Sequence, residues 1–327
     1  MTIDPRSVLI VIPALNEAAH IELCLESLIS PELDGVEVIL ADGGSSDETV
    51  ALAKRFDGRY ARVRIVDNPD RIQSAGVDRA VAEAARPGHR VMVRCDAHAV
   101  YPEHYIRDVV AALEARGAAS VVVAMDSAGR TGFARAAAWI VDTPIGSGGA
   151  AHRAGRKSGW VDHGHHAAFD LDWFRRIGGY DRTFAQNEDA EYDARLRRAG
   201  GRIWLEAGPR LTYWMRDRPS ALARQYWGYG RGRARTLLKH RMRPRARQLI
   251  PVVHLLAQGI CAVLAVVVTP WALAGPLAYL ALLALVSVLG VRRLGREGLW
   301  AGVALGIMHN AWAAGMLWQA LRGWRHG

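Results

Sequence analysis

A carboxylate and an imidazole stand two residues apart in "VMVRCDAHAVYP", where Asp96 and His98 follow a short apolar run. In an extended chain, residues at this spacing point to the same side. A carboxylate oxygen is a ligand for hard divalent ions that bridge phosphate groups, and an imidazole suits Mn²⁺ better than Mg²⁺. The pair is therefore a candidate metal site, although the same residues also occur in ordinary polar loops.

Two neighbouring acids, Glu188 and Asp189, stand directly before a helical pattern in "FAQNEDAEYDARLRRAGG". Acids at the N-terminus of a helix stabilise it by about 0.3–1 kcal/mol through the helix dipole. They can also act as a general base beside a reacting group. The spacing alone does not choose between these roles.

Polar residues also follow the first two apolar runs of the chain. The run "VLIVIPALNE" ends in Pro13, Asn16 and Glu17, and "VEVILADGGSSDET" places Asp42 at its end. Ligands of open α/β sheets bind at the carboxyl ends of the strands. Asp42 could accept a hydrogen bond from a base or a ribose hydroxyl, or it could only cap the following helix.

Histidines and glycines are concentrated farther along the chain. In "WVDHGHHAAF", His163, His165 and His166 are candidates for catalysis or acceptor binding, with a polar loop as the alternative. Just before them, "TPIGSGGAAHRAGRKSG" contains Arg153 in a glycine-rich stretch. This stretch could be a mobile lid over a phosphorylated ligand, or a loop in solvent.

These residues belong to a region in which β-branched runs alternate with helical patterns. The alternation extends from Met1 to about Gly208 and predicts an α/β domain with a mostly parallel central sheet. The predicted strands are "SVLIVIPAL", "VEVILADGG", "VRIVDN", "RVMVRCDA" and "SVVVAMDS", and two clear helices are "EAAHIELCLESLIS" and "SSDETVALAKRF". We expect the sheet to position the candidate residues at the ends of its strands.

Three long runs in the C-terminal part carry no charged residue. They are "LIPVVHLLAQGICAVLAVVV", "WALAGPLAYLALLALVSVLG" and "LWAGVALGIMHNAWAAGMLWQAL". Each is close to the roughly 20 apolar residues that a membrane-spanning helix needs. The sequence therefore predicts a transmembrane region at 249–327 with about three helices, and a buried helical hairpin of a soluble protein is the alternative.

The charges between these runs predict a topology. If the first run leads out of the cytosol and the second returns, the arginines of "VRRLGRE" stay inside, as the positive-inside rule requires. We expect the third run to cross once, with His309 and Asn310 turned toward other helices, because polar side chains are costly in lipid. A turn near His309 would instead keep Arg322 inside.

The segment 216–248 is strongly basic and contains a single acid, Asp217. It accounts for much of the net charge of +10. Next to a membrane, each cation is worth about 1 kcal/mol at an anionic leaflet, and a lipid-linked diphosphate would be attracted in the same way. The segment could also be only a positive-inside signal. No nucleic acid is expected as a partner, because no recognised binding module accompanies the charge.

Length, cysteines and the N-terminus agree with an intracellular catalytic part. A chain of 327 residues can form one large domain or two modest ones. Three scattered cysteines, Cys24, Cys95 and Cys261, argue against a disulfide framework and indicate a reducing compartment. The N-terminus lacks the features of a signal peptide, so we expect the N-terminal part in the cytosol.

Four motifs together resemble a known family. "PALNE", "ADGGSSDET", "DAH" and "NEDAE" occur in the order and at the intervals of family 2 inverting glycosyltransferases of the GT-A fold, and the resemblance covers Val8 to about Arg233. The basic segment and apolar runs are similar to the ExoA-like branch, which acts in succinoglycan and other exopolysaccharide biosynthesis. The resemblance implies a Rossmann-like α/β GT-A domain at 1–215, a juxtamembrane segment at 216–248 and transmembrane helices at 249–327.

The resemblance also implies roles for individual residues. Asp96 and His98 would hold a divalent metal, Mn²⁺ or Mg²⁺, and Asp189 beside Glu188 would deprotonate the acceptor. The implied nucleotide-binding residues are Pro13, Asn16, Glu17, Asp42, Gln73, Ser74, Gly76 and Asp96. The candidates for acceptor or diphosphate contacts are His163, His165, His166, Arg153, Gln225, Trp227 and Arg231.

The implied activity is transfer of a sugar from a nucleotide-sugar, expected to be a UDP-sugar, to a polyprenyl-diphosphate-linked glycan. It would take place at the inner membrane, with the catalytic domain facing the cytosol. Two alternatives remain: a polyprenyl-monophosphate sugar synthase, whose acceptor needs no general base, and a non-catalytic nucleotide-binding scaffold. The Gln-x-x-Arg-Trp motif of processive relatives is matched only loosely by "RQYWGYGRGR".

Overall fold

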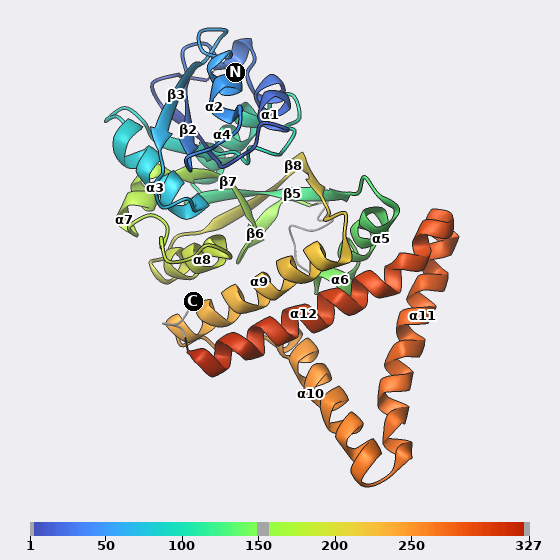
Figure 1. Ribbon diagram of the computed structural model, residues 1–327. Coiled ribbons are helices and arrows are strands. Elements are labelled where there is room, and N and C mark those ends of the chain that lie inside the picture. Colours follow the sequence, from blue (N-terminus) through green and yellow to red (C-terminus); the bar gives the residue numbers. More distant parts are fainter. Residues whose placement is uncertain (1–2, 149–156, 324–327) are drawn as a thin grey trace. The chain divides into compact units, whose positions relative to one another are not determined.

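The computed structural model describes residues 3–148 and 157–323. The chain divides into two compact units (Figure 1). The first, called the sheet unit here, contains Met1–Asp126 and Ala154–Thr212. The second, the helical unit, contains Ser127–Arg153 and Tyr213–Gly327. The sequence did not predict that Ser127–Arg153 would group with the C-terminal part, and the predicted limits at 215 and 248 stay predictions.

The sheet unit is built on one eight-stranded sheet with the order β3-β2-β1-β4-β7-β5-β8-β6. Strands β1 to β4 are parallel to one another, whereas β7 is antiparallel to both β4 and β5. The sheet is therefore the mixed, mostly parallel α/β sheet that the sequence predicted. The strands are β1 (Val8–Ala14), β2 (Glu37–Asp42), β3 (Arg62–Asp67), β4 (Val91–Arg94), β5 (Ser120–Ala128), β6 (Gly159–Val161), β7 (His165–Asp170) and β8 (Ile203–Trp214).

The register of the parallel strands aligns their carboxyl ends. Pro13 of β1 pairs with Ala41 of β2, and Asp42 at the end of β2 pairs with Ala14. On the other side of β1, Arg94 at the end of β4 pairs with Val11. Both β1 and β2 are buried almost throughout, as expected for apolar, β-branched strands covered on both faces. The polar residues that follow these strands therefore start from one edge of the sheet.

Helices α3, α7 and α8 share one hydrophobic core with the sheet. Val77 of α3, Phe174 of α7 and Leu196 of α8 belong to the same buried cluster as Leu9 and Val11 of β1. Each such side chain contributes roughly 1.5–3 kcal/mol when it is fully buried. The helices of this unit are α1 (Ile21–Leu28), η1 (Pro31–Leu33), α2 (Thr49–Lys54), α3 (Gln73–Ala84), α4 (Tyr105–Arg116), α7 (Leu171–Arg176) and α8 (Glu188–Arg198).

The helical unit has its own core, in which Phe133 and Ile140 pack with Leu222 and Leu305. Helix α12 lies alongside α9, and α10 and α11 form a hairpin (Figure 1). Two apolar spans, Ala246–Val267 and Pro270–Arg322, are long enough to cross a membrane. The elements are α5 (Gly132–Val141), α6 (Pro144–Ser147), α9 (Pro219–Lys239), α10 (Ala246–Val267), η2 (Pro270–Leu273), α11 (Ala274–Leu294), η3 (Gly295–Leu299) and α12 (Trp300–Arg322).

Candidate active site

The loops that follow β1 and β2 are joined by hydrogen bonds. The backbone N–H of Asn16 donates to Oγ of Ser45 at 2.9 Å, and Oδ1 of Asn16 accepts from the N–H of Ser46 at 2.8 Å. The N–H of Glu17 donates to Oγ1 of Thr49 at 2.7 Å. Asn16 has a φ of 56°, a left-handed conformation that asparagine tolerates better than most residues. The two predicted nucleotide-binding loops therefore form one continuous rim.

The carboxylate of Asp42 accepts hydrogen bonds from residues of its own turn. It accepts hydrogen bonds from the N–H of Gly44 at 3.1 Å, from the N–H of Ser45 at 3.0 Å and from the Ser45 hydroxyl at 2.6 Å. Only 7% of Asp42 is exposed. The residue before α2 is Glu48, so Asp42 closes the loop and does not cap the helix itself. Its contact with a nucleotide stays a prediction.

The carboxylate of Asp96 lies between an amide and an imidazole. Its Oδ1 accepts from Nε2 of Gln73 at 3.1 Å, and its Oδ2 lies 3.4 Å from Nε2 of His165. The N–H of Asp96 donates to the hydroxyl of Tyr101 at 2.5 Å. Burial raises the pKa of Asp96, but the charges of His165 and then Arg94 outweigh it, so the pKa is lowered. The structure thus brings together an ionised carboxylate, Gln73 and His165.

His98 contacts the loop after β1. Its Nδ1 lies 3.2 Å from Oε1 of Glu17, and its side chain is 55% exposed. Within residues 3–148 and 157–323, no three His, Cys, Asp or Glu side chains converge into a metal-binding group. The metal site that the sequence predicted at Asp96 and His98 stays a prediction.

Arg94, which the sequence analysis missed, lies beside the acid pair. Its Nη1 and Nη2 donate to the two oxygens of Asp189 at 2.7 and 3.3 Å, and Nη1 also donates to the Tyr180 hydroxyl at 2.9 Å. The Tyr180 hydroxyl in turn donates to Oδ1 of Asp189 at 2.7 Å. Nη1 lies 3.8 Å from Glu188, and Nε lies 3.9 Å from Asp96. One buried cation is thus shared by three acids.

The two acids of the pair differ in their protonation. Burial, followed by the charge of Asp189, raises the pKa of Glu188 to about 7. Burial acts on Asp189 in the same direction, but Arg94 and then His166 hold the pKa of Asp189 well below its usual range. Asp189 is therefore ionised at neutral pH, whereas Glu188 exchanges its proton near neutral pH.

Two of the three clustered histidines bind one buried carboxylate. Nδ1 of His163 lies 2.6 Å from Oδ2 of Asp193, and Nε2 of His166 lies 2.7 Å from Oδ1. His166 is fully buried and stacks on Phe169 at 4.8 Å. Burial lowers the pKa of His166, but Asp193 more than compensates, so the pKa is raised. These contacts hold the start of β7 and the residue His163 before it against α8, one turn beyond Asp189.

Ser74 and Gly76 of α3 lie in the interior. The Ser74 hydroxyl donates to the carbonyl of Phe184 at 3.0 Å. A Cβ at Gly76 would lie 2.9 Å from Nδ2 of Asn68 and 3.3 Å from Cβ of Ala41. The close approach of Gly76 to Ala41 places α3 next to β2. Direct contacts of Ser74 and Gly76 with a nucleotide stay predictions.

The remaining predicted acceptor residues lie elsewhere in the chain. Three are on α9 in the helical unit, and Arg153 lies outside the described residues. Within the helical unit their contacts include Gln225 with Tyr213 at 2.7 Å, Trp227 with Trp318 at 6.1 Å between ring centroids, and Arg231 with Gln319 at 3.4 Å.

Comparison with known proteins agrees with the fold and the motifs. Residues 9–178 match the family model for glycosyl transferase family 2. Over 340 aligned residues the chain is 44% identical to the succinoglycan biosynthesis protein ExoA of Rhizobium meliloti (strain 1021), covering 98% of this chain and 96% of ExoA. It is 30% identical over 105 residues to the uncharacterized glycosyltransferase YibD of Escherichia coli (strain K12), covering 32% of this chain and 30% of YibD.

A solved structure shows the same fold. The mannosyltransferase PcManGT from Pyrobaculum calidifontis, in complex with GDP-Man and Mn²⁺, superposes with a TM-score of 0.56 and 20% identity. The similarity covers 97% of this chain and 88% of PcManGT. The family match spans more than half of the chain, and the similarity to ExoA extends over nearly all of it. The chain belongs to glycosyl transferase family 2 and has the GT-A fold.

Proposed function

We propose that this protein is a membrane-anchored, metal-dependent inverting glycosyltransferase of exopolysaccharide assembly, similar in role to the succinoglycan protein ExoA. It would move a sugar from a UDP-sugar to a polyprenyl-diphosphate-linked glycan. Family membership and 44% identity to ExoA support this class of reaction. The bound GDP-Man and Mn²⁺ in PcManGT are an example of a nucleotide-sugar and a divalent ion on the same fold.

The observation that carries the proposal is the grouping of acids at the end of β4. Asp96 is ionised beside Gln73 and His165, and the acid pair lies on the far side of Arg94. One carboxylate is thus available to a cation, and a separate pair is available to a proton. A metal-dependent transferase that activates an acceptor hydroxyl uses both.

The donors present fit a divalent ion that arrives with the nucleotide. Asp96 offers an ionised oxygen ligand and His98 an exposed imidazole. Mg²⁺ and similar ions are commonly held by one or two protein ligands together with substrate phosphates, so a pair of donors suffices. When bound, the ion would neutralise the negative charge that develops on the departing diphosphate.

The acid pair would remove the proton of the acceptor hydroxyl. As the acceptor oxygen bonds to the anomeric carbon and the bond from that carbon to the diphosphate breaks, Asp189 takes the hydroxyl proton. Arg94 and Tyr180 keep Asp189 ionised and fixed in orientation. Glu188, with a pKa of about 7, can then exchange a proton with solvent near neutral pH. A single displacement inverts the configuration of the sugar.

This proposal gives each of the three predicted segments of the chain a separate role. Residues 1–215 would be the cytosolic catalytic domain, 216–248 a basic juxtamembrane segment and 249–327 the membrane region. The two apolar spans beginning at Ala246 and Pro270 support a membrane anchor. The many cations of 216–248 suit the anionic lipids of the inner, cytoplasmic membrane.

The experiment that tests the proposal compares acceptors. The full-length protein in membranes is incubated with a panel of sugar nucleotides and either lipid-linked glycans or polyprenyl monophosphate, and products are read by mass. We expect transfer to a glycan hydroxyl, because the acid pair supplies the base that a phosphate acceptor does not need. Transfer to the monophosphate alone would identify a polyprenyl-monophosphate sugar synthase, and metal-linked UDP binding without transfer would identify a scaffold.

A further inference from the structure

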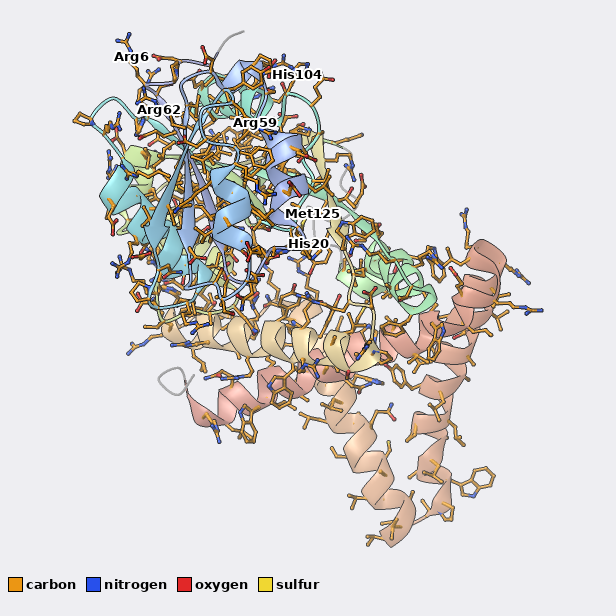
Figure 2. The ribbon with its side chains drawn as sticks, turned by 45° about the horizontal axis from the view of Figure 1, so that its top comes forward. Arg6, His20, Arg59, Arg62, His104 and Met125 are labelled. Atoms are coloured by element: carbon orange, nitrogen blue, oxygen red, sulfur yellow. The ribbon has the colours of Figure 1, made fainter. Side chains whose placement is uncertain are left out.

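The hairpin formed by α10 and α11 exposes apolar side chains along its length. Val266 and Trp271 are each 87% exposed, and Leu277 is 60% exposed. Within the helical unit, the hairpin projects beyond the α9–α12 pair in both views (Figures 1 and 2). Such a surface is unfavourable in water and favourable in lipid, because apolar area is removed from water there.

The length and charge of the hairpin match a bilayer. Helices of 22 and 21 residues are about 33 and 32 Å long, which is close to the hydrocarbon thickness of about 30 Å. No charged residue occurs between Arg247 and Arg292. Arginines flank the open ends of both helices: Arg243, Arg245 and Arg247 on one side and Arg292, Arg293 and Arg296 on the other. Both open ends therefore suit the cytosolic face, and the tip suits the opposite face.

Helix α12 has the same apolar composition but is packed against protein. Its buried residues include Ala301, Leu305, Met308 and Met316. Its backbone is in close contact with that of α9. A Cβ at Gly230 of α9 would lie 2.0 Å from the carbonyl oxygen of Trp312, and one at Gly315 of α12 would lie 2.2 Å from that of Trp227. The two helices must therefore lie at the same depth relative to a membrane.

Helix α9 is too basic for the hydrocarbon. The part that runs beside α12 includes Arg224, Arg231, Arg233 and Arg235. Arginines at the centre of a bilayer are strongly unfavourable, whereas at the headgroup level they are attracted to anionic lipid. Because α12 shares the depth of α9, the charges of α9 also fix the position of α12.

Polar contacts hold both ends of α12 and its middle. Glu297, just before α12, forms an ion pair with Arg135 of α5. Near the other end, Gln319 is 1% exposed and accepts a hydrogen bond from Arg231. In the middle, Nδ1 of His309 lies 3.3 Å from the Tyr279 hydroxyl of α11, and Nε2 lies 3.0 Å from a carbonyl of α6. This confirms the expectation that His309 turns toward other helices, whereas Nδ2 of Asn310 donates to the carbonyl of Gly306 within α12 itself at 2.8 Å.

We propose that only the α10–α11 hairpin crosses the membrane, and that α12 lies beside α9 at the headgroup level of the cytosolic leaflet. The membrane is then crossed twice, and the end of α12 returns to the cytosolic side. The sequence alone favoured a third crossing by α12, which would leave Arg322 outside. The inference rests on the proposed membrane anchorage and concerns which segments take part in it.

Cysteine labelling tests the topology in the full-length protein. Cys261→Ser removes the one native cysteine of the hairpin, and Cys24 and Cys95 are buried. Single cysteines are then introduced by Trp271→Cys at the tip and Arg322→Cys at the end of α12. Arg296→Cys, between α11 and α12, is the matched cytosolic control. Spheroplasts are treated with a membrane-impermeant maleimide before and after lysis.

We expect the tip variant to be labelled in intact spheroplasts, and the Arg322 and Arg296 variants to be labelled several-fold more after lysis than before. Labelling of Arg322→Cys in intact spheroplasts, at the level of Trp271→Cys, would establish a third crossing and overturn the proposal. Labelling of the tip only after lysis would show that the hairpin does not cross. Leu321→Cys, at an 87% exposed position, replaces Arg322→Cys if that variant folds poorly.

A second measurement separates the topology from the anchorage. Membranes that contain the unmodified protein are washed with alkaline carbonate, which releases peripheral proteins. Retention in the pellet is expected for a hairpin that spans the bilayer. Release into the supernatant would overturn the anchorage itself, whereas retention together with external labelling at Arg322 would overturn only the two-crossing topology.

Discussion

Nη1 of Arg94 lies 2.7 Å from Oδ1 of Asp189, and the two side chains are only 2% and 15% exposed. The contact joins the last residue of β4 to the first turn of α8. Removing one partner of a buried ion pair leaves the other charge without compensation. The stability of the sheet unit is therefore linked to the charge of the candidate active site.

Arg94→Met is expected to lower the free energy of unfolding by about 3–5 kcal/mol, because Asp189 and Glu188 lose their buried counter-ion. Denaturant unfolding followed by tryptophan fluorescence measures the change. The double variant Arg94→Met/Asp189→Asn should recover part of the loss. Arg90→Met, at a side chain 72% exposed, is the matched control and should have little effect. Equal stability of Arg94→Met and the unmodified protein would show that the pair contributes nothing.

Asp189→Asn is expected to reduce glycosyl transfer by roughly 10²- to 10⁴-fold, because the amide keeps the shape but accepts no proton. Affinity for UDP in the presence of Mn²⁺ should stay unchanged, since Asp96 is intact. Transfer rates and UDP titrations are measured on the same preparations. Glu103→Gln, at a side chain 87% exposed, is the control for loss of one carboxylate. Near-normal transfer by Asp189→Asn would exclude Asp189 as the base.

Glu188 should make stability depend on pH. Its pKa is about 7 in the folded protein, against an ordinary value of 4.5, because of burial and then Asp189. The folded state thus binds the proton more tightly, so this contribution to stability is complete below pH 4.5 and is lost as the pH rises through 7. Glu188→Gln removes this loss and should raise stability at pH 8 by the order of 1–3 kcal/mol.

The measurement is thermal unfolding of both proteins between pH 4.5 and 8 in the presence of a chelator. The difference between Glu188→Gln and the unmodified protein should be close to zero at the acidic end and should grow toward pH 8. A difference that is constant over this range would mean that Glu188 titrates normally in the folded state.

Asp96 and His98 should control the response to metal. Asp96→Ala is expected to abolish both transfer and the gain in UDP affinity that a divalent ion provides, because the ionised oxygen ligand is lost. His98→Asp should retain some activity and shift the preference from Mn²⁺ toward Mg²⁺, since an oxygen replaces the imidazole nitrogen. Metal titrations of UDP binding and transfer check both. An unaltered metal preference in His98→Asp would remove His98 from the coordination shell.

The ends of the strands could be predicted from the sequence because their pattern is local. Apolar, β-branched runs that stop at polar residues place Asp42 at the end of β2 and Asp96 just after β4, and the parallel register then brings those ends to one edge. The order of the four family motifs identified the acid pair, Glu188 and Asp189, at the start of α8. None of these predictions required knowledge of contacts between distant side chains.

Arg94 was missed because its role depends on a partner 95 residues away. A single basic residue in an apolar strand has no periodic pattern, and its direction is set only when α8 packs beside β4. The one available signal was an arginine two residues before Asp96 in an otherwise apolar run. The pairing of His163 and His166 with Asp193 was hidden for the same reason, since it joins separate elements.

Helix α12 shows a second limit of prediction from sequence, because composition does not reveal what surrounds an apolar helix. Its hydropathy is similar to that of α10 and α11, so composition predicts the same environment for all three. The difference lies in packing, because glycines at 230 and 315 permit close contact with α9. The grouping of α5 with this part of the chain was equally invisible, since an alanine-rich helix fits many surfaces.

The turn at the tip of the hairpin, from Thr269 to Leu273, contains no charged residue. In the proposed two-crossing topology, only this short neutral turn would have to pass through the hydrocarbon for the hairpin to become inserted. The hairpin also leaves the ribosome after the whole of the sheet unit has been made. The order of the chain therefore allows the sheet unit to begin folding in the cytosol before the anchor enters the membrane.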